Sequence, residues 1–234
     1  MRWKASELLL EIFQTMNIFF PSIPFIFQIR KFYKNKSSTG FSRKLCMIII
    51  IANVLRIFFW FGKFFHWSLL AQSILLIFTK IIVIRTSIKF AEKKESLMPN
   101  RSKFQWDSTL YYLTFIVTLI LLLEIISVFF TFQNNIYVEV LGTISSTIEA
   151  TLPIPQIIEN FRRKSTKNLS NTLVGCWILG DSMKTIYFYV SAAPIQLLIS
   201  GMAQILLDVF VIFQICIYRK LDPAREPLAS NNVN

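Results

Sequence analysis

The stretch Leu152-Pro153-Ile154-Pro155-Gln156 lies inside a long apolar run that covers residues 136–158. Proline inside a helix removes a backbone donor and clashes with the carbonyl four residues earlier, so this stretch predicts a broken or kinked helix. The run is still long enough to cross a bilayer, which takes roughly 20 apolar residues. A break at membrane depth is tolerated where neighbouring helices or water satisfy the released backbone groups. The stretch therefore predicts a broken helix within a membrane-embedded bundle.

Six further apolar runs resemble this one in length and character. The seven runs cover residues 7–29, 44–62, 67–88, 108–132, 136–158, 171–190 and 194–218. The chain is 54% apolar and only 16% charged, whereas a soluble domain carries about 25% charged residues. We therefore expect an all-α membrane protein with seven transmembrane helices.

The net charge of +12 is concentrated in connectors between the apolar runs. Most Lys and Arg residues lie in the connectors at 30–43, 85–107 and 159–170 and in the tail after residue 218. These segments fall on one side of a seven-helix path, which the positive-inside rule makes cytoplasmic. We expect a lumenal N-terminus and a cytoplasmic C-terminus. We expect no nucleic-acid partner, because nucleic-acid binding requires a basic folded face.

The two halves of the chain match without gaps at an offset of 128 residues. Equivalent pairs include Glu11 and Glu139, Gln28 and Gln156, Ser42 and Ser170, Leu69 and Leu197, and Val83 and Val211. Because three helices are an odd number, the run at 108–132 restores the orientation of the second copy, and the repeats are parallel. The expected organisation is a first repeat at 1–88, a basic loop and linking helix at 89–132, a second repeat at 133–218 and a tail at 219–234.

Ionisable residues recur near the middle of two helices. Asn53 and Arg56 are equivalent to Asp181 and Lys184, and the members of each pair share one helix face because they are three residues apart. An ionised side chain at the bilayer centre costs about 2.5–3.5 kcal/mol on insertion scales. Together with Glu149, two turns before the Pro-Gln dipeptide, these residues predict either a substrate path or a structural ion pair that locks the repeats.

The proline and glutamine residues of the broken helices form a second candidate set. It comprises Pro24, Gln28, Pro153, Pro155 and Gln156. The first repeat has Phe27-Gln28 where the second has Pro155-Gln156, and Pro24 keeps a helix break in a shifted position. Two interpretations remain open for this set, a fixed kink needed for packing and a hinge that moves during transport.

The other reactive residues indicate no bond chemistry. Lys80 and Asp208 are equivalent under the repeat, His66 stands alone, and Cys46, Cys176 and Cys216 have no metal-like spacing. No paired Ser and His, no phosphate-binding glycine loop and no cluster of metal ligands occurs in the sequence. We expect neither an enzyme nor a bound metal or cofactor.

These motifs resemble the PQ-loop repeat family. The second repeat carries Pro155-Gln156 followed by Leu169-Ser170, and the first has Phe27-Gln28 followed by Gly40-Phe41-Ser42. The family includes lysosomal amino-acid exporters and relatives of the sugar-transporting SWEETs, so the resemblance implies a 3+1+3 helix arrangement. The sequences Ala52-Asn53-Val54-Leu55-Arg56-Ile57-Phe58-Phe59-Trp60-Phe61-Gly62 and Gly180-Asp181-Ser182-Met183-Lys184-Thr185-Ile186-Tyr187-Phe188 are most similar to the branch of PQ-loop repeat-containing protein 1 and its fungal counterpart.

That branch implies a location in endosomes and the trans-Golgi network, and a role in phospholipid asymmetry and endosome-to-Golgi traffic. The first functional hypothesis is thus a phospholipid scramblase, or a regulator of phospholipid asymmetry, with membrane phospholipids as partners. The alternative is a proton-coupled carrier of a small, amino-acid-like solute, with Asp181 or Glu149 taking up the proton. A third hypothesis is a trafficking receptor that transports nothing.

Overall fold

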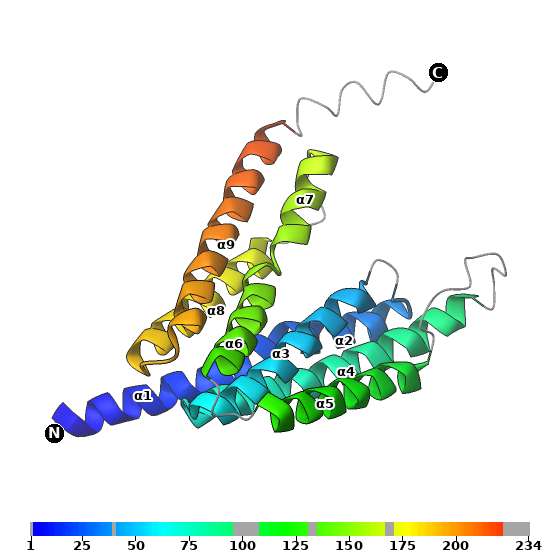
Figure 1. Cartoon of the computed structure of the whole chain (residues 1–234). Helices are drawn as coiled ribbons and strands as arrows, with labels where there is room; N and C mark the ends of the chain where they lie inside the picture. The colour runs from blue at the N-terminus through cyan, green and yellow to red at the C-terminus, as the bar shows by residue number, and fades with distance from the viewer. Residues whose placement is uncertain (1, 39–40, 96–107, 131–134, 167–170, 222–234) are drawn as a thin grey trace, which may run out of the picture. The chain divides into compact units, whose positions relative to one another are not determined.

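In a computed structural model, the structure describes residues 2–38, 41–95, 108–130, 135–166 and 171–221, and within them every regular element is a helix (Figure 1). The elements in order are α1 (Arg2–Phe19), the 3-10 helix η1 (Phe20–Ser22), α2 (Ile23–Asn35), α3 (Arg43–Lys63), α4 (Trp67–Glu95), α5 (Thr109–Phe130), α6 (Asn135–Ala150), α7 (Ile154–Arg163), α8 (Asn171–Val190) and α9 (Ile195–Leu221). The expected basic loop and tail fall largely on residues 96–107 and 222–234, outside the described residues.

These elements match the seven predicted spans. Among the described residues, five segments are long and apolar enough to cross a membrane: Glu11–Asn35, Arg43–Lys63, Trp67–Ala91, Thr109–Phe130 and Ile195–Tyr218. The remaining two spans are α6 continued by α7, which the predicted break divides, and α8, which carries Asp181 and Lys184. The first segment is also divided, at η1, so each repeat begins with a broken helix.

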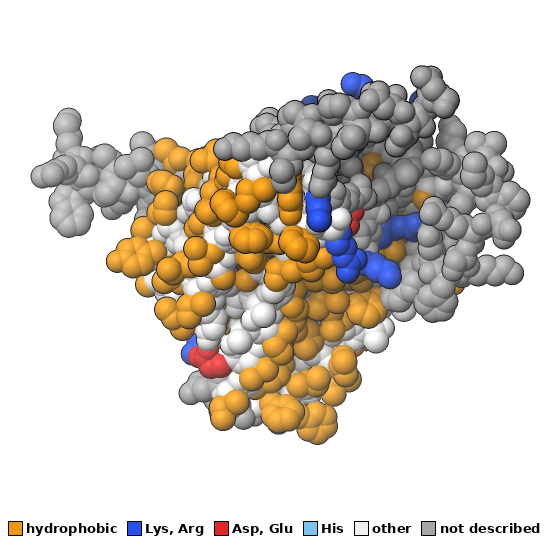
Figure 2. All heavy atoms as spheres, turned by 90° about the horizontal axis from the view of Figure 1, so that it is seen from above, with side chains coloured by type: hydrophobic (Ala, Val, Ile, Leu, Met, Phe, Trp, Pro, Cys, Tyr) orange, Lys and Arg blue, Asp and Glu red, His pale blue; other side chains and the backbone are white. Residues whose placement is uncertain are grey.

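The exterior of the helices is apolar and part of the interior is polar. Large side chains of α5 such as Val117, Leu121, Val128 and Phe129 are exposed, whereas Lys80, Gln72 and Arg56 are buried. In Figure 2 hydrophobic side chains dominate the described part of the face in view. This inversion fits a bilayer as the solvent, because lipid tails accept apolar groups and charged groups must turn inward.

The chain forms two compact units, Met1–Ile148 and Glu149–Asn234. In the first unit, α4 packs against α1, α2, η1, α3 and α5. Helix α6 packs closely on α3: a Cβ added at Gly142 would lie 2.6 Å from the Phe59 ring, and one at Gly62 would lie 2.5 Å from Val138. Lys63 and Glu139 join the same two helices through an ion pair of 2.6 Å.

In the second unit, α9 packs against both α7 and α8. An apolar core of Val174, Val211 and Ile215 joins these helices, and Ile157 and Trp177 pack against it. In this unit α9 is thus the long helix that contacts both the shorter α7 and the polar α8.

Backbone geometry repeats with the sequence. The non-glycine residues with positive φ in the described part of the chain are Lys36, Phe64, Lys164 and Ala192, all with φ of 45–47°. They form two pairs, each separated by the offset that relates the repeats. Residues with a Cβ atom rarely adopt a positive φ, so the intrinsic preferences of these four residues do not explain why it recurs at equivalent positions. Both halves close equivalent helices in the same way, which confirms the predicted duplication.

Candidate functional site

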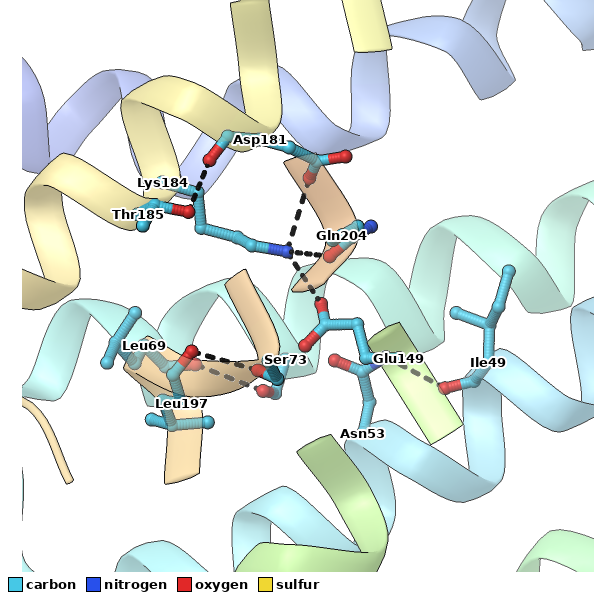
Figure 3. Close-up of polar contacts among 11 residues, drawn as sticks. Ile49, Asn53, Leu69, Ser73, Glu149, Asp181, Lys184, Thr185, Leu197 and Gln204 are labelled. Carbon is cyan, nitrogen blue, oxygen red and sulfur yellow. Dashed lines mark hydrogen bonds and ion pairs between the residues drawn. The ribbon is translucent and has the colours of Figure 1, made fainter. Parts of the chain in front are cut away.

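Lys184 lies at the centre of a buried ionic cluster in the second unit (Figure 3). Its Nζ atom lies 3.3 Å from Glu149 Oε1 and 3.3 Å from Asp181 Oδ1, and it donates a hydrogen bond of 2.8 Å to Gln204 Oε1. The lysine comes from α8, Glu149 from the end of α6 and Gln204 from α9. Three segments that are distant in sequence therefore meet at one ammonium group. We call Lys184, Glu149, Asp181 and Gln204 the ionic cluster.

A further carboxyl group adjoins the ionic cluster. Asp208, buried on α9, is close enough to Asp181 and Lys184 for their charges to interact. The site thus contains three acids and one cation. Two neighbouring ionised carboxyl groups repel each other, and the ammonium group of Lys184 offsets part of that repulsion.

The structure brings together three of the five residues of the predicted path and adds one that sequence reasoning missed. Glu149, Asp181 and Lys184 meet as described. Gln204 was not singled out, because an amide among apolar residues carries little signal. Its spacing to Asp208 is informative in retrospect, since residues four apart lie on one face of α9.

The other two predicted path residues lie in the first unit. Asn53 and Arg56 are both buried on α3, at 3% and 1% exposure. Asn53 Nδ2 donates to Ile49 O at 2.8 Å, so its amide is partly used by its own helix. The same unit contains two buried amides that the sequence analysis did not single out, Asn17 on α1 and Gln72 on α4. Neither forms a hydrogen bond with any described residue.

The predicted break in the second repeat is present and its backbone is satisfied. Pro153 precedes α7 and Pro155 lies in its first turn, where proline is favoured because the position needs no intrahelical donor. The N–H groups of Leu152, Ile154 and Gln156 bond to carbonyls three residues earlier at 3.0–3.2 Å. Tight turns therefore replace the lost helical bonds.

The break in the first repeat is shifted, as predicted from Pro24. Helix α2 begins at Ile23, which is equivalent to Thr151, whereas α7 begins at Ile154. Pro24 lies in the first turn of α2, and Pro21, which the sequence analysis missed, lies in η1. Gln28 is half-buried in α2. Both repeats thus have a proline-containing helix break, but the break lies at different equivalent positions.

Gln156 belongs to a chain of amides that connects α7 with α9. Gln156 Nε2 donates to Asn160 Oδ1 at 2.7 Å, and Asn160 Nδ2 donates to Gln214 Oε1 at 3.0 Å. Gln214 Nε2 in turn donates to the carbonyl of Ile157 at 3.0 Å. This amide chain attaches the helix after the break to the long helix α9. The glutamine of the dipeptide thereby holds α7 in place within its own unit.

Comparison with known proteins agrees with this architecture. The family described as PQ loop repeat matches residues 9–69 and 137–197, two segments related by the offset of the internal repeat. Scramblase ANY1 of Saccharomyces cerevisiae is 24% identical, over 81% of this chain and 66% of that protein. This chain therefore spans slightly less than two thirds of the length of that relative.

A solved structure has the same fold. A eukaryotic SWEET transporter superposes with a TM-score of 0.65 at 15% identity, covering 90% of this chain and 97% of the transporter. The likeness confirms seven transmembrane helices arranged as two three-helix repeats joined by a linking helix. Since the two family matches together cover more than half of its residues, the chain belongs to the PQ-loop repeat family.

Proposed function

We propose that this protein is a phospholipid scramblase, or a regulator of phospholipid asymmetry, in membranes of endosomes and the trans-Golgi network, and that it serves endosome-to-Golgi traffic. The observation that carries the proposal is the similarity to a protein named as a scramblase, which extends over 81% of this chain. The two proteins share the PQ-loop repeats, and the exposed surfaces of α5 and α9 are suited to lipid tails.

The ionic cluster supplies the polar groups that such a function needs at membrane depth. A phospholipid head group crossing the hydrocarbon layer loses its hydration, and charges at that depth are disfavoured by several kcal/mol. Lys184 can exchange a carboxylate for a lipid phosphate, while Glu149 and Asp181 can bind a head-group amine. Asn53 and Arg56 offer a second set of polar partners in the first unit. In this proposal the tails stay in the bilayer throughout.

A second candidate function is a proton-coupled carrier of a small solute. The observation that favours it is the grouping of three acids, Glu149, Asp181 and Asp208, near the buried ammonium group of Lys184. A proton held between two acids can be released when a cation or a polar solute arrives, which is the coupling that such a carrier requires. The broken helices at η1 and at 151–153 then act as hinges for alternating access.

Orientation follows from charge. We place the N-terminus in the lumen and the ends of α2, α4, α7 and α9 in the cytoplasm, because the basic connectors adjoin these ends. The last turn of α2 contains Lys34, and α7 ends with Arg162 and Arg163.

Reconstitution of the purified protein in liposomes separates the two functions. The first assay follows a fluorescent phospholipid in both leaflets by reduction with external dithionite. The second follows uptake of labelled amino acids under an imposed pH gradient in the same preparation. A scramblase exposes nearly all of the fluorescent lipid to dithionite, whereas a carrier leaves about half protected. Lipid protection equal to that of protein-free liposomes would reject the scramblase proposal.

A further inference from the structure

The first unit contains a buried lysine that the ionic cluster does not use. Lys80 lies in the middle of α4 with 0% exposure, and its Nζ atom has no hydrogen-bond partner among the described residues. Its ammonium group instead faces the ring of Phe25 on α2, 2.9 Å from the ring centroid. A buried amino group without hydrogen bonds is strongly disfavoured, so Lys80 is in a position to gain from an incoming anion.

Two buried serines lie on the same face of α4 as Lys80. Ser73 and Ser87, seven residues before and after it, share its helix face and are as deeply buried. The Ser87 hydroxyl forms no hydrogen bond with any described residue. The thiol of Cys46, on α3, is close enough to Lys80 to interact with its charge. Together they form a buried polar stripe with a positive centre.

The Phe25 ring covers the ammonium group at the centre of this stripe. Phe25 belongs to α2, the helix that follows the break at η1. It is the third residue of α2, directly after η1, and it is half-buried while Lys80 is fully buried. The break itself touches α4, since Ser22 Oγ lies 3.5 Å from Thr79 Oγ1, next to Lys80. The Phe25 ring thus lies just after a helix break, where a change in the tilt of α2 can alter its distance from the ammonium group.

We propose that Lys80 is the centre of a gated anion site that takes a phosphate group, and that Phe25 on α2 is its gate. Phosphate supplies the countercharge and the acceptors that Lys80 lacks, and lysine binds phosphate readily as a point charge. Ser87 is a further buried donor on the same helix face, two turns from Lys80. The phosphate can come from a lipid head group or from free phosphate, and only the first assignment rests on the proposed function.

Cys46 provides a native reporter for the gate, since it is 2% exposed and close enough to Lys80 to interact with its charge. With Cys176 and Cys216, which are both exposed, replaced by serine, an anionic methanethiosulfonate reagent measures access to Cys46 in phosphate-free detergent. The variant Phe25→Ala removes a desolvated cation–π contact, so labelling should accelerate about 5- to 30-fold. The matched control is Phe27→Ala, whose side chain lies on the same helix but is 60% exposed.

Protection of Cys46 identifies the ligand. The probes are inorganic phosphate and monomeric dihexanoylphosphatidylcholine, each compared with sodium chloride of equal ionic strength. Protection by the lipid alone assigns the site to head groups, and protection by inorganic phosphate alone assigns it to free phosphate. Protection by both assigns it to the phosphate group in general. Lys80→Met should abolish protection and Lys80→Arg should keep it, with thermal unfolding showing that each variant is folded.

Two results overturn the proposal. One is labelling of Phe25→Ala within twofold of Phe27→Ala, which removes the gate. The other is absence of protection by both probes, which removes the anion site. Because labelling requires no transport, a failed scrambling assay with intact protection would reject the proposed function alone, and scrambling without protection would reject this site alone.

Discussion

Replacement of Lys184 by methionine tests whether the ionic cluster holds the fold, serves transport or does both. The change keeps an unbranched side chain, one atom shorter, but removes the ammonium group, which is 3.3 Å from two carboxylates and 2.8 Å from Gln204. Glu149, Asp181 and Asp208 are then left without their cation. Removing one partner of a buried ion pair destabilises proteins by about 3–5 kcal/mol. At about 2–4 °C per kcal/mol, the unfolding temperature should fall by roughly 6–20 °C.

Asp181→Asn should be milder, and the structure gives two reasons. Glu149 still faces Lys184, so only one charged contact of about 1.5–3 kcal/mol is weakened. The new amide can also donate to Asp208, where two acids met before. We therefore expect a loss of about 1–2 kcal/mol. The double variant Asp181→Asn with Lys184→Met should recover part of the stability lost in Lys184→Met, because fewer acids remain uncompensated.

The measurements are thermal unfolding in detergent, followed by tryptophan fluorescence, and scrambling in liposomes at matched protein density. Leu179→Met, an exposed change on the same helix, is the control. If the cluster serves transport, the double variant regains stability but not activity. A loss of scrambling that is independent of pH supports the lipid proposal, while loss of pH dependence with retained exchange supports the carrier. Wild-type stability and activity in Lys184→Met would refute the reasoning.

Three further predictions concern the break, the orientation and the packing. Pro155→Ala should change the unfolding temperature little, because Pro155 lies in the first turn of α7. Phe27→Pro should destabilise the protein by about 3 kcal/mol, because Phe27 lies within α2. If Pro155→Ala stays folded, a loss of transport would indicate a moving hinge, and unchanged transport would indicate a fixed kink. Cysteines at the equivalent exposed positions Lys34 and Arg162, in a cysteine-free background, should react with an impermeant reagent from the cytoplasmic side, and lumenal labelling of either would contradict the orientation. Gly142→Ala should destabilise by about 1–3 kcal/mol, since its Cβ would meet the Phe59 ring at 2.6 Å, while Gly175→Ala, with open space around it, should be neutral or slightly stabilising in the same unfolding assay.

Structural features that depend on residues close together in the chain could be predicted directly from the sequence. Proline chemistry predicted the breaks, since the lost donor and the steric clash act within four residues of Pro24 and Pro153. The shifted break of the first repeat followed from Pro24 in the same way. Pro21 could have been identified by this rule as well, and its omission left η1 unpredicted.

Contacts between side chains of different helices could be predicted only in part from the sequence. The spacing of Asp181 and Lys184 placed both on one face of α8, and the two-turn spacing suggested Glu149 for the same path. Gln204 was not predicted as a member of the site, because a single amide in a long apolar helix has no polar partner nearby in the sequence. The partners of Gln156 could not be predicted either: within its unit it belongs to the amide chain with Asn160 and Gln214, residues that no local pattern distinguishes.

The sequence by itself determined the membrane class, the seven spans and the internal duplication, because hydropathy, charge distribution and an ungapped repeat are properties of the chain read in order. Only the tertiary structure decided that Lys184 meets Glu149, Asp181 and Gln204, and that Lys80 lies under Phe25. The physical reason is that contacts between helices depend on the rotation and axial register of each helix. These are fixed by packing such as the close approach of Gly142 to Phe59, which involves residues far apart in the sequence.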